Sequence, residues 1–477
     1  MTIYQNLIAG EWTGAEAVEN INPSDTKEVV GLYASGSAAD TGNAIAAAKA
    51  AFPAWSRSGI WERHVILKKA GDEIMARKDE LGALLAREEG KTLPEAIGET
   101  IRASQIFEFF AGEALRLAGE VVPSVRPNIG VEITREPLGV IGIITPWNFP
   151  IAIPAWKIAP ALCYGNTIVF KPAELVPGCS WAIVDILNRA GLPKGVLNLV
   201  MGKGSIVGQT MLDSPDLAGI TFTGSVGTGK RVAVSSIEHN RKIQLEMGGK
   251  NPMVVLDDAD LSVAVEAAAN SAFFSTGQRC TASSRLIVTE GIHDRFVAAM
   301  TEKLKTLNVD HALKTGTHIG PVVDERQLKT DTDYIEIGKK EGAKLAFGGE
   351  LISRDTPGFY LQPTLFTEAT NQMRISREEI FGPVASVIRV KDYEEALAVA
   401  NDTPFGLSSG IATTSLKHAT HFKRNAEAGM VMVNLPTAGV DFHVPFGGRK
   451  GSSYGSREQG KYAAEFFTTV KTAYTLA

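Results

Sequence analysis

Short apolar runs alternate with longer amphipathic segments from about residue 139 onward. The first five runs are closed by glycine or proline, as buried strands of parallel sheets usually are. The segments between them are long enough for crossover helices, so the pattern predicts a doubly wound α/β fold with a parallel sheet. The five runs read GVIGIIT, NTIVFKP, VLNLVMG, GITFTGS and IQLEMGG.

A second series of apolar runs begins near residue 249 and predicts a second α/β domain, whereas roughly the first 115 residues look largely helical. Two extended pieces fit neither pattern. Residues 119–138 read as two strands and a turn, and the C-terminal AEFFTTVKTAYTLA alternates like a further strand. Extended pieces outside both cores are candidates for pairing with each other or with a second subunit.

Composition narrows the class of protein. A chain of 477 residues exceeds one ordinary core, so two or three domains are expected. The net charge of −5, with acidic and basic residues interspersed, gives no reason to expect a nucleic-acid partner. The three cysteines, Cys163, Cys179 and Cys280, cannot all pair, which favours a reducing compartment. The N-terminal MTIYQNLIAGEW lacks the pattern of a secretory signal, so a cytoplasmic protein is expected.

The uncharged stretch of residues 138–156 would be long enough to cross a bilayer. It contains Pro146, Pro150 and Pro154 and a polar TPWN in its middle. Because proline removes helical hydrogen bonds, we expect a buried strand, a turn and the start of a helix there, and no membrane span.

The run GITFTGS leads into TFTGSVGTGKRVA, where Gly224, Gly229 and Lys230 have the spacing of a phosphate-binding GxxxxGK loop. Arg231 follows where a nucleoside triphosphatase would carry Ser or Thr for Mg²⁺, which disfavours that class. Two alternatives remain: a plain strand-to-helix turn, or a helix N-terminus near a dinucleotide pyrophosphate. The GxGxxG signature of the second is absent, so the loop alone does not decide.

Two residues could carry covalent and acid–base chemistry. Cys280 lies among small and polar residues in FSTGQRCTASSR, and the adjacent Arg279 suits a reachable thiolate with a lowered pKa. A single cysteine beside an arginine is nevertheless more often inert. Glu246 ends the apolar strand IQLE, where a carboxylate either forms a buried salt bridge or keeps a raised pKa that suits a general base.

Two further motifs end predicted strands. Asn148 lies in the stiff turn TPWNFP, where its amide could donate to a developing oxyanion, although making a turn is the commoner role of asparagine. Lys171 and Glu174 belong to FKPAE, at the sheet edge where doubly wound folds bind ligands.

Six motifs occur in the order TPWNFP, FKPAE, FTGS, LEMGGKNP, GQRC and EEIFGP, and in this order the chain resembles the aldehyde dehydrogenase superfamily. The likeness runs from AGEWT near the start to PFGG and beyond. It implies an α/β, aldehyde dehydrogenase-like fold with three parts. These are a Rossmann-type NAD-binding domain (residues 1–118 and 139–248), an α/β catalytic domain (249–448), and a small β element for assembly into a dimer or tetramer (119–138 and 462–477).

The resemblance also implies a mechanism. Cys280 attacks the aldehyde carbon, and the side-chain amide of Asn148 and the backbone N–H of Cys280 hold the oxyanion. A hydride passes from the thiohemiacetal to the nicotinamide and leaves a thioester. Glu246 then activates the water that releases the carboxylic acid.

The family pattern assigns cofactor residues as well. Lys171 would bind the adenosine ribose, and Glu174, close to the 2′ position, would repel a 2′-phosphate and favour NAD over NADP, with NADP still possible. Ser225 would contact the pyrophosphate, and Lys230 would face solvent. The remaining cofactor residues implied by the resemblance are Thr145, Trp147, Gly224, Glu379 and Phe381.

The implied substrate funnel consists of Phe149, Ile153, Trp156, Arg279, Phe442, His443 and Phe446. Arg279 could pair with a carboxylate at the far end of a short substrate, or could turn to an internal Glu or Asp. The segments STGQRCTASSR and VDFHVPFGGRKGSSYGSREQGKYAAEFFT resemble most the α-ketoglutaric semialdehyde (2,5-dioxopentanoate) dehydrogenase branch. The helix after PWNFP lacks an arginine that some members of that branch carry, so the charge would come from Arg279 or Arg449.

We therefore expect NAD(P)-dependent oxidation of an aldehyde to a carboxylic acid, with α-ketoglutaric semialdehyde as the favoured substrate. Succinic or glutaric semialdehyde and a neutral aliphatic aldehyde are alternatives. A non-catalytic NAD-binding or structural member, the alternative from another class, is expected to lack Cys280 or Glu246, and both are present. No metal site is expected, because His418 and His421 lie three apart without a third ligand.

Overall fold

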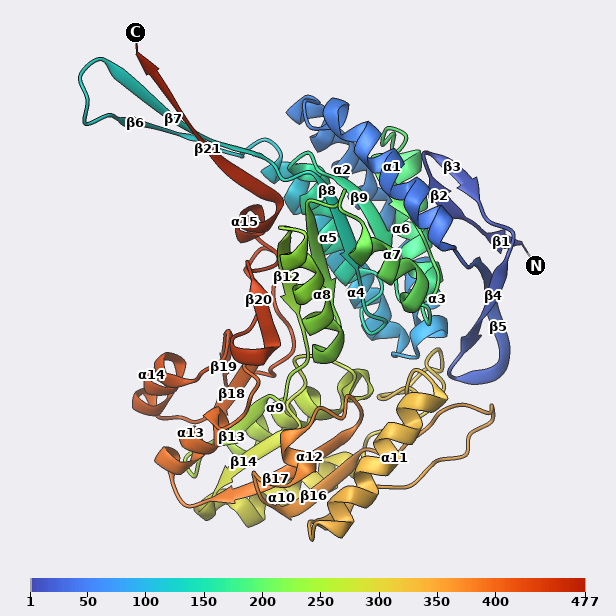
Figure 1. The fold of residues 1–477 in the computed structure, drawn as a ribbon. Helices are drawn as coiled ribbons and strands as arrows, with labels where there is room; N and C mark the ends of the chain where they lie inside the picture. Colours follow the sequence, from blue (N-terminus) through green and yellow to red (C-terminus); the bar gives the residue numbers. More distant parts are fainter. Residues whose placement is uncertain (1, 477) are drawn as a thin grey trace.

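A computed structural model describes residues 2–476 of the chain. Its two large sheets form separate layers with helices against them, the first in the upper and the second in the lower part of Figure 1. A third, narrow sheet projects away from both as an arm that carries the C-terminus (Figure 1). The doubly wound α/β class expected from the sequence is confirmed.

The first sheet has eight strands in the order β20-β12-β11-β8-β9-β10-β2-β3. Its five central strands are mutually parallel, and every residue of β9 and β11 is buried. Burial on both faces explains why these strands appear in the sequence as continuous apolar runs and not as alternating ones. The five strands are β8 (Val140–Ile144), β9 (Thr167–Lys171), β10 (Leu197–Leu199), β11 (Gly219–Thr223) and β12 (Lys242–Glu246).

Helices connect these parallel strands, as crossover connections require. Residues 138–156 form β8, a turn and the start of α5, as expected. Among the described residues, no helix combines the length and the apolar character needed to cross a membrane. The helices of this layer are α5 (Ala152–Cys163), α6 (Pro177–Arg189), α7 (Gln209–Asp213) and α8 (Val226–Glu238).

The second sheet has seven strands in the order β15-β16-β17-β14-β13-β18-β19, all parallel except β15. The strands are β13 (Pro252–Val255), β14 (Arg285–Thr289), β15 (Lys344–Phe347), β16 (Thr364–Ala369), β17 (Val384–Val390), β18 (Ser408–Ala412) and β19 (Met430–Val433). The helices are α9 (Leu261–Phe273), α10 (Glu290–Lys305), α11 (Glu325–Lys340), α12 (Arg374–Arg377), α13 (Tyr393–Asn401) and α14 (Leu416–Asn425).

The expectation of a largely helical N-terminal region is wrong for residues 3–34, which form five strands. Two of them extend the first sheet, β2 antiparallel to β10 and β3 antiparallel to β2, and the other three form a small sheet of their own. These segments are short and separated by turns, so none of them shows the periodicity of apolar residues that is typical of a helix. They are β1 (Ile3–Tyr4), β2 (Asn6–Ile8), β3 (Glu11–Thr13), β4 (Ala17–Asn22) and β5 (Asp25–Ala34).

Four helices follow, and the last of them reaches the site described below. Helix α4 packs against α2, α3 and α5. A capping box starts it: Thr92 at the N-cap and Glu95 three residues later satisfy each other's backbone N–H groups. The four are α1 (Ala38–Trp55), α2 (Ile60–Ala76), α3 (Lys78–Glu89) and α4 (Leu93–Glu113).

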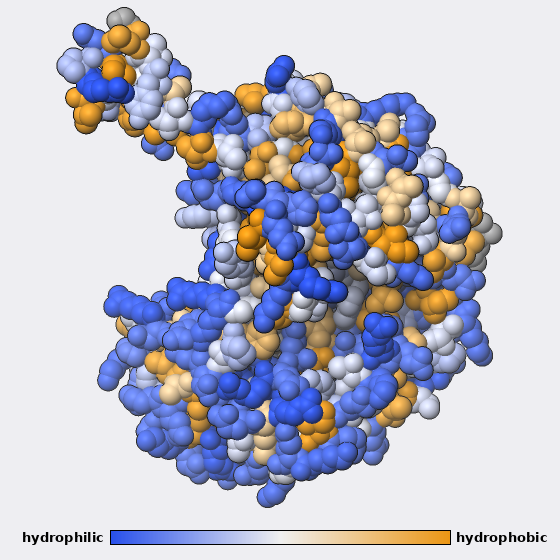
Figure 2. All heavy atoms as spheres, in the orientation of Figure 1, coloured by the Kyte–Doolittle hydropathy of each residue, from blue (hydrophilic) through white to orange (hydrophobic). Residues whose placement is uncertain are grey.

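The arm consists of β6 (Glu120–Pro123), β7 (Ile129–Pro137) and β21 (Thr468–Leu476). Strand β21 runs antiparallel to β7 along its whole length, from Thr468 opposite Pro137 to Leu476 opposite Ile129. The two extended pieces therefore pair with each other, which was one of the two pairings considered. Apolar side chains are exposed on the arm, and Figure 2 shows them as orange patches on the projecting strands.

One strand links the C-terminal region to the first sheet. Strand β20 (Ser453–Gly455) pairs antiparallel with β12, and the short helix α15 (Ala464–Phe467) leads from this region into the arm. The domain division predicted from the sequence assigned residues 449–461 to no part, and β20 places some of them in the first sheet. The division as a whole stays a prediction.

Candidate active site

The candidate site lies where the two large sheets face each other. Asn148 follows β8 and Glu246 ends β12, so both come from carboxyl ends of the first sheet. Cys280 precedes β14 and Glu379 precedes β17, so both come from amino ends of the second sheet. Carboxyl ends of strands beside a change in strand order are where doubly wound sheets bind ligands, and here β8 lies between β9 and β11.

The loop before Cys280 has a strained backbone. Ser275 and Thr276 have φ values of 50° and 57°, in the left-handed region that residues with a side chain avoid. The carboxylate of Glu95 holds Ser275 through its backbone N–H at 2.8 Å and its hydroxyl at 3.0 Å, and Thr276 donates to the carbonyl of Gly320. Strain of this kind persists only where surrounding contacts enforce it, and it concentrates at functional sites.

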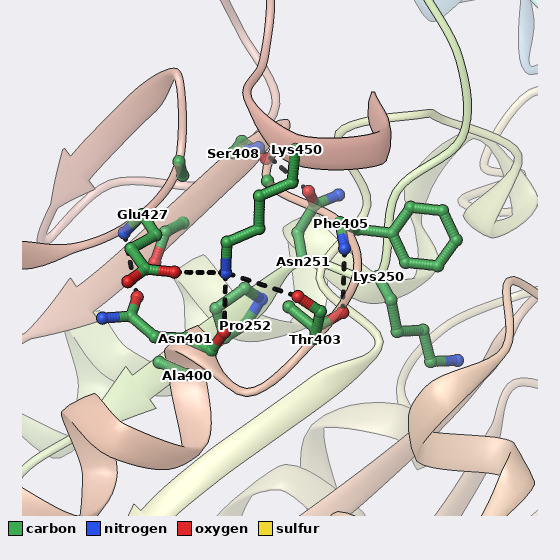
Figure 3. A pocket seen from close by; sticks show the side chains of 13 residues that line it. Lys250, Asn251, Pro252, Ala400, Asn401, Thr403, Phe405, Ser408, Glu427 and Lys450 are labelled. Atoms are coloured by element: carbon green, nitrogen blue, oxygen red, sulfur yellow. Dashed lines mark hydrogen bonds and ion pairs between the residues drawn. The ribbon is translucent and has the colours of Figure 1, made fainter. Parts of the chain in front are cut away.

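Asn251 holds the other side of the loop. Its side-chain amide donates to the carbonyls of Cys280 at 2.7 Å and Ala282 at 2.9 Å, and its oxygen accepts from the backbone of Ser408 at 2.9 Å. Figure 3 shows Asn251 beside Ser408, and near them Lys450, which donates to the carbonyl of Asn401. The cavity drawn there is only about 10 Å³, which is room for no more than a water-sized molecule.

The structure changes one expectation about Cys280. The half-buried thiol has a pKa raised to about 12, first by burial and then by the charges of Glu246 and Glu379. Arg279 does not lower this pKa, because its guanidinium turns to the carboxylate of Glu95, 2.9 Å away. The resting thiol is therefore protonated at neutral pH, and its activation requires a base.

Asn148 is 3% exposed and lies next to the nucleophile loop. Its Nδ2 donates to the carbonyl of Gln278 at 2.9 Å, and its own carbonyl accepts from Lys91 Nζ at 2.6 Å. An amide nitrogen carries two hydrogens, so a second donor remains for an oxyanion formed at Cys280.

Glu246 is 3% exposed, and burial followed by the nearby Glu458 raises its pKa well above the usual value. The hydroxyl of Ser453 donates a hydrogen bond to Glu246 at 2.5 Å, and this bond lowers the pKa of the carboxyl group. Glu246 forms no ion pair within the described chain, and its raised pKa is the second alternative weighed from the sequence; its role as a general base stays a prediction. The ion pair nearby joins Lys157 to Glu458.

A cavity of about 430 Å³ opens beside Cys280. Of the predicted substrate residues, Phe149, Trp156, Arg279 and Phe446 line it, and Phe446 stacks on Trp156 with ring centroids 5.3 Å apart. Ile153 is 1% exposed in the hydrophobic core, so it does not reach the cavity. The ring of Phe442 packs edge to face against the ring of Phe109. Neither Phe442 nor His443 lines the cavity in the described chain.

The charged lining of this cavity was not foreseen. Helix α4 and the segment that leads into it supply Lys91, Glu95, Glu99 and Arg102. Positions four and three residues apart lie on one face of a helix, so this spacing is a signal that sequence reasoning had available. The same spacing of charged residues is typical of an ordinary solvent-exposed helix face, so the spacing alone did not predict a charged cavity. Asn251 and Ser453 were missed as well, although Asn251 lies within LEMGGKNP.

A second cleft of about 400 Å³ lies at the carboxyl ends of the first sheet, beside the start of α8. Glu174 lines it and accepts a hydrogen bond from the backbone of Gly204 at 2.7 Å, and Lys171 Nζ lies 3.8 Å from Glu174. Ser225 caps α8, which leaves the first N–H groups of the helix free for an anion, and Lys230 is exposed as expected.

The residues expected at the nicotinamide end also lie together. The ring of Trp147 meets Phe381 edge-on at 5.3 Å. Glu379 accepts from the backbone of Gly249 at 2.8 Å, and burial raises its pKa to about 7. The buried hydroxyl of Thr145 has no hydrogen-bond partner among the described residues. A buried polar group without a partner fits a ligand that supplies one, so the unpartnered Thr145 hydroxyl fits the nicotinamide end of a bound dinucleotide.

No group of three or more His, Cys, Asp or Glu side chains in the described residues has a geometry for holding a metal ion. His418 and His421 both pack on Tyr393: the first stacks on its ring, and the second accepts or donates a hydrogen bond at its hydroxyl, 2.7 Å away.

The chain belongs to the aldehyde dehydrogenase family, whose sequence profile matches residues 12–473. It is 45% identical over 476 residues to an alpha-ketoglutaric semialdehyde dehydrogenase of Bacillus subtilis (strain 168), across 99% of this chain and 98% of that relative. A 2,5-dioxopentanoate dehydrogenase of Saccharolobus solfataricus is 42% identical over 479 residues, across 99% of each chain. Betaine aldehyde dehydrogenase of Staphylococcus aureus, solved in complex with NAD⁺, is 33% identical with a TM-score of 0.97, across 99% of this chain and 95% of that one.

Proposed function

We propose that this protein oxidises α-ketoglutaric semialdehyde to 2-oxoglutarate with NAD. The observation that carries the proposal is the charge of the cavity beside Cys280, whose lining holds three cationic side chains and two carboxylates. The unbalanced positive charge favours a substrate with an anionic end over a neutral or cationic aldehyde. The names of the relatives from B. subtilis and S. solfataricus support the same substrate.

The chain's own residues then act as follows. Glu246 takes the proton of the Cys280 thiol, and the sulfur bonds to the aldehyde carbon. The free hydrogen of Asn148 Nδ2 and the backbone N–H of Cys280 donate to the resulting oxyanion. Bound NAD supplies the acceptor for the hydride that leaves this carbon. Glu246, after losing its first proton to solvent, takes a proton from water as that water attacks the thioester, and the acid departs with the thiol restored.

For the cofactor we propose NAD with Lys171 and Glu174 at the adenosine ribose, Ser225 and Gly224 at the pyrophosphate, and Glu379 at the nicotinamide ribose. The carboxylate of Glu174 disfavours a 2′-phosphate. Lys203 and Arg231 line the same cleft and supply cations that leave NADP as a poorer, but usable, cofactor.

We also propose that the protein acts in the cytoplasm as a homo-oligomer, a dimer or a tetramer, assembled through the arm. The exposed apolar side chains of β6 and β21 support this assembly, because an unpaired sheet edge with apolar side chains is a site for pairing with another chain.

The test is a panel of aldehydes matched in length. NADH formation is measured with α-ketoglutaric, glutaric and succinic semialdehydes, with pentanal and butanal, and with betaine aldehyde. We expect the highest kcat/KM with α-ketoglutaric semialdehyde, and no turnover by Cys280→Ser. A neutral or cationic aldehyde oxidised with equal or higher kcat/KM would contradict the proposed substrate.

A further inference from the structure

The cavity beside Cys280 contains three cations, and the described structure commits two of them to carboxylates. Lys91 Nζ pairs with Glu99 at 2.7 Å and donates to the carbonyl of Asn148. Arg279 pairs with Glu95 at 2.9 Å and donates to the hydroxyl of Ser275.

Both carboxylates also accept hydrogen bonds from other groups. Glu99 accepts from the backbone N–H groups of Ile151 and Ala152 on its second oxygen. Glu95 accepts from the backbone and hydroxyl of Thr92 on its second oxygen, at 3.3 and 3.0 Å. Lys91 and Arg279 are the cations within ion-pair distance of these carboxylates, and the third cation of the cavity is paired with neither in the described chain.

That third cation is Arg102, on the turn of α4 that follows Glu99. Its Nη2 donates to the side-chain oxygen of Gln459 at 3.0 Å, and its guanidinium lies over the ring of Trp156, 5.8 Å from the centroid. Its Nε is buried without a hydrogen-bond partner among the described residues. Arg102 forms no ion pair in the described chain. Burial lowers its pKa, and the negative charges of Glu99 and Asp441 oppose this shift, but from farther away than an ion pair allows.

The guanidinium of Arg102 is half-buried, and its buried Nε is an unused donor, which is costly unless an acceptor completes it. The neutral amide of Gln459 and the face of Trp156 fix the orientation of Arg102 without neutralising it. We propose that Arg102 binds the carboxylate at the far end of the aldehyde substrate and is the residue that determines specificity for semialdehydes. This inference rests on the proposed function and assigns the role to Arg102 in place of Arg279 or Arg449. Arg449 is exposed and does not line this cavity in the described chain.

The experiment compares Arg102→Met with Arg102→Lys and Arg279→Met on two substrates of equal length, glutaric semialdehyde and pentanal. Loss of charge-assisted hydrogen bonds lowers kcat/KM for the semialdehyde by about 10- to 100-fold in Arg102→Met, mainly through KM. The value for pentanal stays within about twofold, because no carboxylate is lost there. Arg102→Lys recovers part of the loss, since it restores the charge without the bidentate geometry.

A binding measurement and a matched control separate this role from a structural one. Glutarate, used as a dead-end inhibitor competing with aldehyde, inhibits the wild type and inhibits Arg102→Met at least tenfold more weakly, by the same reasoning. Arg116→Met, an exposed arginine just after α4, leaves all values unchanged.

The outcomes distinguish the two proposals. If the wild type does not prefer glutaric semialdehyde to pentanal, the proposed substrate class fails. If the wild type shows the preference and Arg102→Met keeps it, or loses both substrates equally, the assignment of Arg102 is wrong and the proposed substrate class stands. A selective loss in Arg279→Met alone would return the role to Arg279.

Discussion

At the scale of single residues, burial shifts the two groups proposed to react toward their protonated forms. Burial raises the pKa of the Cys280 thiol to about 12 and raises the pKa of Glu246 well above its usual value. The base form of Glu246 increases as pH rises, so the rate of the chemical steps increases with pH through the pKa of this carboxyl group.

Replacing Ser453 by alanine shifts this pH dependence. The Ser453 hydroxyl donates to Glu246 and lowers the pKa of that carboxyl group, so its loss raises the pKa further. We expect the rising limb of the kcat–pH profile of Ser453→Ala to move to higher pH, with activity recovered at alkaline pH. Ser456→Ala is the matched control, because no hydrogen bond of its hydroxyl is found in the described structure. An unchanged profile in Ser453→Ala would exclude Glu246 as the titrating base.

Glu174 gives a prediction about the cofactor. Its carboxylate lies in the cleft with Lys203 and Arg231, and removing the negative charge leaves these two cations to a 2′-phosphate. We expect Glu174→Gln to lower the ratio of kcat/KM for NAD to that for NADP by about tenfold, which is the effect of a charge interaction near 1.4 kcal/mol. Steady-state kinetics with both cofactors measures this ratio. Glu238→Gln, at the far end of α8, serves as the control with an unchanged ratio.

At the scale of elements, buried ion pairs join segments far apart in the chain. Lys157 of α5 pairs with Glu458 of the C-terminal region, and it also donates to Thr221 of β11 at 2.7 Å. Both partners of the ion pair are almost fully buried. When one partner of a buried ion pair is removed, the other charge stays in the protein interior with neither water nor a counter-charge. In an exposed pair, water still solvates the remaining charge.

We predict from this contact that Lys157→Met destabilises the protein by about 3–5 kcal/mol, because it leaves the charge of Glu458 buried without a partner. The double variant Lys157→Met/Glu458→Leu recovers most of the loss. Thermal unfolding followed by calorimetry measures both. Lys68→Met breaks an exposed pair with Asp72 and changes stability by less than about 0.5 kcal/mol. Equal destabilisation in the single and double variants would show that packing, and not the ion pair, accounts for the effect.

Helix α4 shows what an element adds beyond its residues. Its capping box uses Glu95, and the same carboxylate holds Ser275 and Arg279 of the nucleophile loop. The start of the helix and the conformation of the catalytic loop are thereby stabilised by one side chain. The next turns present Glu99 and Arg102 to the cavity, so this helix supplies three of the five charged side chains in the lining.

At the scale of the whole molecule, the arm exposes apolar side chains that the rest of the chain does not cover. Val470 and Tyr474 of β21 are 60% and 62% exposed, and Val121 of β6 is 83% exposed. Residues two and four apart on a strand share a face, so Val470 and Tyr474 form part of one apolar surface.

The double variant Val470→Asp/Tyr474→Asp tests the assembly proposed through the arm. Charges on this face oppose burial against a second subunit, so we expect a smaller particle by size-exclusion chromatography with light scattering. Leu416→Asp, an equally exposed apolar position at the start of α14, leaves the mass unchanged. A wild type that is monomeric, or a double variant that keeps its assembly, would contradict an oligomer formed through the arm.

Continuous apolar runs of the chain, closed by glycine and proline, determined that buried parallel strands form, because only residues buried on both faces dispense with alternation. The ordered motifs placed Glu246 and Asn148 at strand ends, singled out Cys280 among small and polar residues, and indicated the family. The short N-terminal strands escaped prediction, because segments of two to ten residues between turns carry too little periodicity.

Only the tertiary structure decided which charges neutralise each other. The carboxylate that takes up Arg279 lies 184 residues earlier in the chain, and the amide that orients Arg102 lies 357 residues later. Local sequence therefore places an arginine beside the nucleophile but does not reveal whether its charge is available. Ion pairing depends on distances of a few ångströms in a medium of low dielectric constant, and those distances exist only once the sheets and α4 have packed.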